Sequence, residues 1–141
     1  MSTKFKEDTG IKIRGVQTEK PTTVVDGDLV LSGDETRKGH LEVKGSIIGS
    51  GGARYSLRVE GDLTVNGAIH VNDLTAANVY AKRGIDARHI DAGDIGAGHI
   101  NANQIKYDLI CIAIGDIKCR SAEGNHKDKP PLSIKGELQL E

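Results

Sequence analysis

Aromatic residues are nearly absent from this chain, and their scarcity argues against several kinds of protein. The 141 residues include three Tyr, one Phe and no Trp. A globular core of this size normally uses more of these large side chains, whereas a narrow core of Ile, Val, Leu and Ala does not need them. Surfaces that stack on nucleic-acid bases or sugars also rely on aromatic rings, so the composition argues against both.

An excess of one charge is missing as well. The 19 basic and 20 acidic residues nearly cancel, which leaves no electrostatic attraction for nucleic acid or an anionic membrane. No apolar run approaches the roughly 20 residues of a membrane span, and the first 20 residues are too polar for a signal peptide. We therefore expect a cytoplasmic protein without nucleic-acid or membrane partners.

Only two cysteines occur, Cys111 and Cys119, both in an apolar neighbourhood. We expect them to be reduced, buried thiols, as is usual in the cytosol. A disulfide would require their Cα atoms to lie within about 7 Å, which the sequence leaves open. A zinc site would need more ligands than this pair supplies.

What the chain has in abundance is a short repeat. Seven consecutive segments place a large apolar residue two positions before a second residue, which is Ala in all but the last of them. They occupy residues 74–76, 79–81, 85–87, 90–92, 95–97, 100–102 and 105–107. The step between segments is five residues everywhere except from Val79 to Ile85, where it is six.

The repeat predicts very short strands joined by corners. Side chains alternate along a strand, so Ile85 and Ala87 point one way and Asp86 the other. Because the next segment begins only a few residues later, the chain must turn a corner at each step, which is typical of a β-helix. A helical stripe recurs at three and four residues and would not keep a five-residue step on one face. Glycines that disfavour a helix by roughly 1 kcal/mol each also occur here: Gly84, Gly93, Gly96 and Gly98.

Six-residue steps continue the pattern on both sides of the array. Here a glycine follows a pair of mostly apolar residues by two positions, as in Leu63-Thr-Val65-Asn-Gly67 and Leu132-Ser-Ile134-Lys-Gly136. The glycines in this position are Gly27, Gly45, Gly61, Gly67 and Gly136. We expect them to share one type of corner, in which a positive φ selects glycine.

These patterns predict a single all-β domain. We expect it to be a right-handed, single-stranded β-helix (β-solenoid) with short strands and Gly corners. We expect coils of about 15 to 24 residues. Residues 1–22 are predicted to form a polar N-terminal arm or cap, and residues 23–141 the β-helix domain. Loop insertions are expected near residues 32–40, 49–56 and 120–131.

One strand is apolar on both faces. Residues 109–114 contain no polar side chain, so a loop, the N-terminal arm or another subunit must cover the face that lies outside the core. The final strand, residues 138–140, is followed by no polar capping segment, and either the loop at 120–131 or a second molecule is expected to cover it. The candidate interface of a homo-oligomer is therefore Leu109, Ile110, Ile112, Ile114, Leu138 and Leu140.

Residues suited to metal binding occur at polar positions of the array. They are Asp86, His89, Asp91, Asp94, His99 and Asn101. Polar residues are required at these positions in any case, and neighbouring ones fall on different sides of the coil. We therefore predict no metal site, no cofactor and no catalytic residue.

Two enzyme classes use β-helices, and neither fits well. Hexapeptide acyltransferases combine strict sixfold repeats in a left-handed coil with a loop histidine between subunits. Here the repeat is mainly fivefold, and His40, His70 and His126 have no recognisable partner. Polysaccharide lyases and hydrolases need longer coils to frame a cleft. We expect that the protein is not an enzyme.

The chain resembles several known solenoids. The Ile-x-Ala-x-x array resembles pentapeptide-repeat proteins in period, although their small residue precedes the large one. Residues 61–67, Gly-Asp-Leu-Thr-Val-Asn-Gly, are similar to the cores of bactofilins, which polymerise end to end. Over residues 57–140 the chain resembles small uncharacterised bacterial β-helix proteins that join such a stretch to Ile-x-Ala repeats and a Tyr…Cys…Ile-Lys-Cys segment. This resemblance implies a β-helix and transfers no catalytic residue.

The expected function is a non-catalytic structural or protein-interaction scaffold that self-associates. The alternative is a ligand-binding module for a metal or a glycan, which would use the glycine-rich residues 49–56 or the surface His and Asp positions. A third reading is an acyltransferase-like enzyme.

Overall fold

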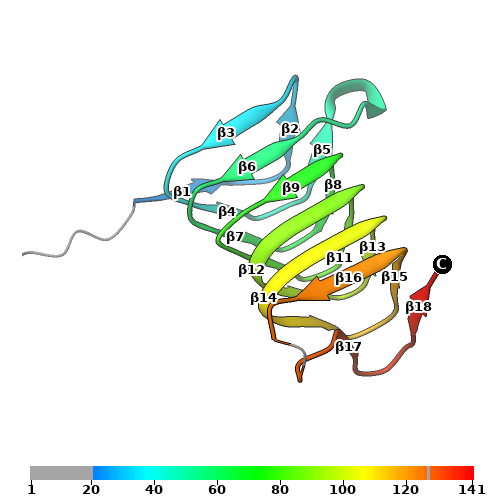
Figure 1. Cartoon of the computed structure of the whole chain (residues 1–141). Coiled ribbons are helices and arrows are strands. Elements are labelled where there is room, and N and C mark those ends of the chain that lie inside the picture. The colour runs from blue at the N-terminus through cyan, green and yellow to red at the C-terminus, as the bar shows by residue number, and fades with distance from the viewer. Residues whose placement is uncertain (1–20, 127) are drawn as a thin grey trace, which may run out of the picture.

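The computed structural model describes residues 21–126 and 128–141, in which parallel strands stack as a β-solenoid of about seven turns (Figure 1). The predicted all-β solenoid is confirmed, while its right hand stays a prediction. Within the described residues no helix is long and apolar enough to cross a membrane. The expected N-terminal arm, residues 1–22, lies outside the described residues apart from Pro21 and Thr22, and Thr22 already begins the first strand.

Each of the first six turns of the solenoid, here called coils, contributes one strand to each of three faces, and the last described turn contributes one strand to face 1 and one to face 2. Face 1 contains β1 (Thr22–Val25), β4 (His40–Val43), β7 (Asp62–Val65), β10 (Asn78–Ala81), the second halves of β12 (His89–Ala97) and β14 (Gln104–Ala113), and β17 (Leu132–Ser133). Face 2 contains β2 (Leu29–Leu31), β5 (Ile47–Gly49), β8 (Ala68–His70), β11 (Gly84–Asp86), β13 (Ile100–Asn101), β15 (Ile117–Cys119) and β18 (Leu138–Leu140). Face 3 contains β3 (Glu35–Arg37), β6 (Leu57–Val59), β9 (Asp73–Thr75), the first halves of β12 and β14, and β16 (Ser121–Gly124).

Strand register gives the length of each coil. Val79 pairs with Leu63 in the preceding coil and with Ile95 in the following one, and the two steps are equal. The coil that leads from Ile85 to its partner Ile100 is among the shortest, and the coil that leads from Leu41 to its partner Leu63 is among the longest. All of these steps fall within the range of coil lengths predicted from the repeat.

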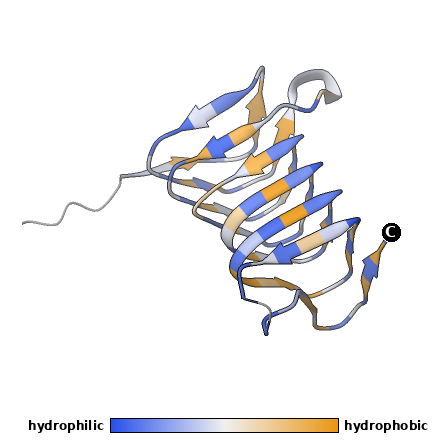
Figure 2. Cartoon of the chain, viewed as in Figure 1, coloured by the Kyte–Doolittle hydropathy of each residue, from blue (hydrophilic) through white to orange (hydrophobic). Residues whose placement is uncertain are grey.

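The core is the bore of the solenoid, filled by the paired residues of the repeat. Ile85 and Ala87 are 0% and 4% exposed, whereas Asp86 between them faces solvent in part. The same pattern runs through the array, as Figure 2 shows by the alternation of hydrophobic and hydrophilic residues along the strands. Three faces converge on one narrow space, which paired aliphatic side chains from each face fill, with Tyr107 as the only aromatic ring among the buried core residues that the structure describes. Burying each Ile stabilises the fold by roughly 1.5–3 kcal/mol.

Not every corner glycine follows the predicted rule. Gly27, Gly45 and Gly67 stack in one column between faces 1 and 2, where the Gly45 N–H donates to Gly27 O and the Gly67 N–H to Gly45 O, both at 2.8 Å. Of these three, Gly27 alone has a positive φ, 100°. A Cβ on Gly67 would stand 2.1 Å from Ser46 Oγ and 2.8 Å from Gly45 O. Close stacking of successive coils therefore selects glycine at Gly45 and Gly67, whereas the predicted positive φ selects it at Gly27, where an added Cβ would meet no atom within 4 Å.

The expectation of one shared corner is also wrong for Gly61. This residue lies between faces 3 and 1, where an added Cβ would stand 2.6 Å from the carbonyl oxygen of Gly39 in the preceding coil. Two different corners thus require glycine for the same reason.

The three segments expected as insertions differ in structure. Residues 50–56 contain the short 3-10 turn η1 (Ser50–Gly52) and separate β5 from β6, while Gly49 is the last residue of β5. The segment expected as a loop at 32–40 instead contains strand β3, and the segment at 120–131 contains β16 before its loop begins.

The last coil departs from the predicted pattern. Ser133 pairs with Ala113 and takes the inward position, so Leu132 and Ile134 point outward and are 53% and 59% exposed. The inward Ser133 hydroxyl donates to Gly115 O at 2.6 Å and accepts the Gly136 N–H at 3.0 Å. Leu132 and Ile134 therefore do not fill the bore as the apolar pairs of the earlier six-residue steps do, because Ser133 takes the inward position at this corner.

Candidate interaction surface

The outer side of face 1 carries a column of residues that runs along the solenoid. Strand register places the outward residues of successive coils next to one another. In order along the axis they are Val24, Glu42, Thr64, Tyr80, Gly96, Ile112 and Leu132. Four of the seven are large and apolar, and three of these four lie in the half that begins at Tyr80.

Further apolar side chains widen this column into a patch. Ile110 and Ile114 are 41% and 53% exposed, and Tyr80 is 54% exposed. We define the apolar patch as Tyr80, Leu109, Ile110, Ile112, Ile114, Leu132 and Ile134. The second half of β14, near the bottom of the view in Figure 2, forms its hydrophobic centre. Contiguous exposed apolar residues of this kind mark interaction sites on soluble proteins.

A shallow hollow of about 480 Å³ lies beside the central column. One wall consists of Asp62, Asn78 and Asp94, and the other is formed by residues of the column, including Tyr80 and Ile112. The face therefore combines an apolar wall with a polar, acidic one.

A ladder of hydrogen bonds orders the acidic wall. Asn78 Nδ2 donates to Asp62 Oδ1 at 2.9 Å, and the Asp94 N–H donates to Asn78 Oδ1 at 2.8 Å. The ladder ends at Asp94, whose Oδ1 atom is shielded from solvent and has no hydrogen-bond partner among the described residues. Because a buried acceptor without a donor costs free energy, this carboxylate is a place where an outside donor would be favourable.

The structure separates the predicted interface residues into two groups. Leu109, Ile110, Ile112 and Ile114 lie together on face 1. Leu138 and Leu140 lie in β18 on face 2, where they pair with the inward residues Ile117 and Cys119 and are 39% and 62% exposed. Leu138 and Leu140 therefore extend the inward-facing columns of the core at the end of the solenoid, and they lie on a different surface from the apolar patch.

Tyr80, Leu132, Ile134 and Asp94 were not predicted as part of this surface. The only signal in the sequence was the equal spacing of Tyr80, Gly96 and Ile112 along the chain. That spacing has a meaning only when the coil length is known.

The loop after β16 covers one corner of the bore. The Tyr107 hydroxyl donates to Lys129 O at 2.7 Å, and a Cβ on Gly124 would stand 2.5 Å from the Tyr107 ring. Tyr107 is 4% exposed, and burial raises the pKa of its hydroxyl. The loop therefore shields part of the last coils, while Leu138 and Leu140 remain exposed.

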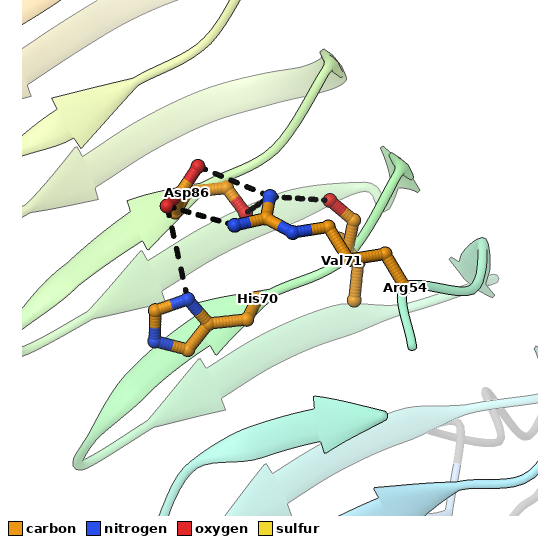
Figure 3. Close-up of polar contacts among 4 residues, drawn as sticks. All are labelled: Arg54, His70, Val71 and Asp86. Atoms are coloured by element: carbon orange, nitrogen blue, oxygen red, sulfur yellow. Dashed lines mark hydrogen bonds and ion pairs between the residues drawn. The ribbon is translucent and has the colours of Figure 1, made fainter. Parts of the chain in front are cut away.

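The glycine-rich loop, residues 50–56, is fastened to the solenoid by Arg54. Its guanidinium donates to both carboxylate oxygens of Asp86, at 2.9 and 3.1 Å, and lies beside the carbonyl of Val71 (Figure 3). Asn72 Nδ2 donates to Arg54 O at 3.1 Å. The hydrogen bond from Arg54 holds the pKa of Asp86 below its ordinary value. Because Arg54 is already paired with Asp86, the loop is fastened to the solenoid and does not present this guanidinium to an anion.

The surface histidines and aspartates pair locally. His89 Nδ1 lies 3.0 Å from Asp73 Oδ1, and His70 Nδ1 lies 3.9 Å from Asp86 Oδ2. Across residues 21–126 and 128–141, no three His, Cys, Asp or Glu side chains gather into a group that could hold a metal ion. Among the predicted polar positions of the array, Asp86 and His89 thus form pairs along the outside of the coils.

Both cysteines are free and point into the bore. Cys111 and Cys119 are each 1% exposed. Burial, with a smaller contribution from Cys119, raises the pKa of Cys111 to about 12. Neither thiol is poised for chemistry, because the reactive form of cysteine is the thiolate.

Comparison with protein-family models, curated proteins and solved structures gives no match for this chain. The fold defines it as a β-solenoid repeat protein. Its most unusual surface is the apolar patch of face 1 with the acidic wall beside it.

Proposed function

We propose that this protein is a non-catalytic structural scaffold that self-associates through face 1. The supporting observation is the apolar patch, most of whose members, among them Tyr80, Ile110 and Ile112, project outward from strands of face 1. Removing such side chains from water on contact with a second copy is favourable by roughly 25 cal/mol per Å². A sheet surface held by parallel pairing on both sides needs little reordering on binding, which reduces the entropic cost of association.

We also propose that the chain belongs with the small bacterial β-helix proteins that combine Ile-x-Ala-x-x repeats with a Tyr…Cys…Ile-Lys-Cys segment, and that it acts in the cytoplasm. The resemblance to bactofilin cores, which polymerise, is consistent with a role in assembly. The balanced charge of the chain gives no reason to invoke nucleic acid as a partner.

The two alternative functions have less support. A ligand-binding role for residues 49–56 is disfavoured because Arg54, the cation of that loop, is paired with Asp86. An acyltransferase-like reaction would need a histidine positioned at a cleft. His40 instead accepts the Asp62 N–H on Nδ1 at 2.9 Å and lies at the edge of face 1.

Sedimentation velocity from micromolar to near-millimolar concentration tests the proposal. We expect the wild-type mass to rise with concentration, and we expect Ile112→Asp to remain a monomer because it places a charge in the patch. Asn101→Asp, which adds the same charge to the exposed outer side of face 2, is the matched control and should associate like the wild type. A wild-type protein that stays monomeric at the highest concentration would contradict the proposal.

A further inference from the structure

We infer that two copies pack face 1 against face 1 as a two-fold dimer with parallel solenoid axes, so that Lys82 of each copy lies beside Asp94 of the other. This inference rests on the proposed self-association and specifies its geometry. It is carried by the distribution of charge on the two edges of face 1 and by the unpartnered carboxylate of Asp94.

Between β7 and β17 the two edges of face 1 carry opposite charge. At the edge where strands begin, Asp62, Asn78 and Asp94 form the acidic ladder. At the edge where strands end, Lys82 follows the last inward residue of β10, and its N–H donates to the carbonyl of Val65 one coil back. Further along this edge stand Asp26 and Lys44, and Lys44 is paired with Glu42 at 3.4 Å. The apolar column lies between the two edges.

This asymmetry distinguishes the two simple ways of placing one sheet on another. A two-fold axis parallel to the solenoid axis lays the acidic edge of one copy on the basic edge of the second. A two-fold axis along the strands lays each edge on itself, so that Asp94 meets no lysine of the second copy, and with an axis through β10 it meets Asp62 instead. Because like charges across an interface are unfavourable and opposite charges are favourable, the parallel arrangement is selected.

Asp94 and Lys82 are the residues best placed to meet. Asp94 has one carboxylate oxygen shielded from solvent without a donor, and no other residue that the structure describes pairs with the carboxylate. Lys82 is exposed, and its ammonium group likewise has no ion-pair partner in the described part of the chain. The two residues lie on adjacent coils, about 4.8 Å apart along the axis, a distance that a lysine side chain spans.

The apolar patch is also compatible with the parallel arrangement. The parallel arrangement lays Ile112 against Ile112 of the second copy, because the central column faces the same column of that copy. It lays Ile110 against Ile114, because the edge where strands begin faces the edge where strands end. Tyr80 meets Tyr80 in the same way. From β7 to β17 the footprint is about 300 Å² per copy, well below the roughly 800 Å² per partner of a stable complex. The dimer should therefore depend strongly on concentration.

Charge reversal tests the predicted contact. We expect Lys82→Asp and Asp94→Lys each to weaken dimerisation by about tenfold or more, and the double variant that exchanges the two charges to recover to within a few-fold of the wild type. Lys118→Asp, an equivalent reversal at an exposed position of face 2, should have no effect. Circular dichroism of each variant checks that the fold is unchanged.

A distance measurement tests the parallel orientation independently of any charge. A spin label on Val24→Cys, at an exposed position of the first coil, would lie about 10 to 20 Å from the label of the second copy in the parallel dimer. A two-fold axis along the strands would separate the labels by about 30 Å if it passed through β10 and by about 50 Å if it passed through β14. The native thiols should escape labelling because Cys111 and Cys119 are buried.

The outcomes separate the two proposals. A wild-type monomer would remove both the self-association and its geometry. A wild-type dimer that is insensitive to Lys82→Asp and Asp94→Lys, or that gives only one of the longer distances, would overturn the parallel arrangement and leave the self-association in place. Loss in both single variants, recovery in the exchanged double variant and a short distance are the results that we expect.

Discussion

The ring of Tyr80 lies against Gly96 of the next coil, where an added Cβ would stand 3.3 Å from the Cδ1 atom of the ring. The glycine gives the ring a flat surface on which to rest, so a large aromatic side chain lies along the sheet beside the hollow. Aromatic residues held in this way at the centre of an interface often carry a large share of its binding energy.

We therefore predict that Tyr80→Ser weakens self-association by about tenfold or more. The free energy of unfolding should change by less than about 0.5 kcal/mol, because the side chain is largely exposed in the single chain. Sedimentation velocity and chemical denaturation measure the two effects. Equal self-association in the variant and the wild type would show that Tyr80 lies outside the interface.

Substitution of a stacked corner glycine should destabilise the solenoid. In Gly67→Ala the new Cβ would stand 2.1 Å from Ser46 Oγ and 2.8 Å from a carbonyl of the preceding coil, so the coils must move apart locally. We expect a loss of about 1–3 kcal/mol, which urea denaturation measures. Gly33→Ala is the matched control, because its Cβ would meet no atom within 4 Å. A loss of the same size in both variants would contradict the role assigned to coil stacking.

The attachment of the loop at residues 50–56 should depend on pH. Arg54 lowers the pKa of Asp86 from its ordinary value of 3.8, so the pairing stabilises the folded state above that value. This stability is lost as the pH falls through the lowered pKa. The contribution is less than about 1 kcal/mol because both side chains are partly exposed. We expect amide exchange in the loop, corrected for its intrinsic rate, to increase at acid pH.

The variant Asp86→Asn serves as the control for this pH effect. It should show fast exchange in the loop at all pH values, since the charge of Asp86 is absent. A wild-type loop that keeps its protection at the most acid pH where the protein stays folded would argue against the ion pair as the fastening.

The two thiols should react slowly in the folded protein. Burial raises the pKa of Cys111 to about 12 and also raises that of Cys119, so both stay protonated at neutral pH. We expect iodoacetamide to modify them at the rate of global unfolding, and rapidly once denaturant is added. Rapid modification in the native state would show that the bore opens near β15.

Much of the fold could be predicted because the repeat is visible within stretches of two to six residues. The pair Ile85 and Ala87 shows the alternation of a strand, and the short step to Ile90 requires a corner. Burial of these residues confirms the prediction. The corners were harder to predict, because glycine suits both a positive φ and a close contact, and only the structure shows that the close contact operates at Gly67.

The surface could be predicted only in part, since it depends on how the coils align. The apolar run at 109–114 is visible in the sequence, and its outward side chains are indeed exposed. Tyr80 joins it only because the coil length places Tyr80, Gly96 and Ile112 side by side, and Leu132 joins it only because Ser133 takes the inward position. A shift of one residue reverses every side chain in a strand, and a local pattern does not specify that shift.

The equal steps that join Leu63, Val79, Ile95 and Cys111 give the middle of the molecule a translational symmetry. Duplicating residues 78–93 would add one complete coil, keep each inward position inward and lengthen the molecule by about 4.8 Å. A duplication one residue shorter or longer would turn the core residues of the following strand outward. This section of the gene can therefore grow or shrink in whole units, so the length of the molecule is open to selection while its cross-section is not.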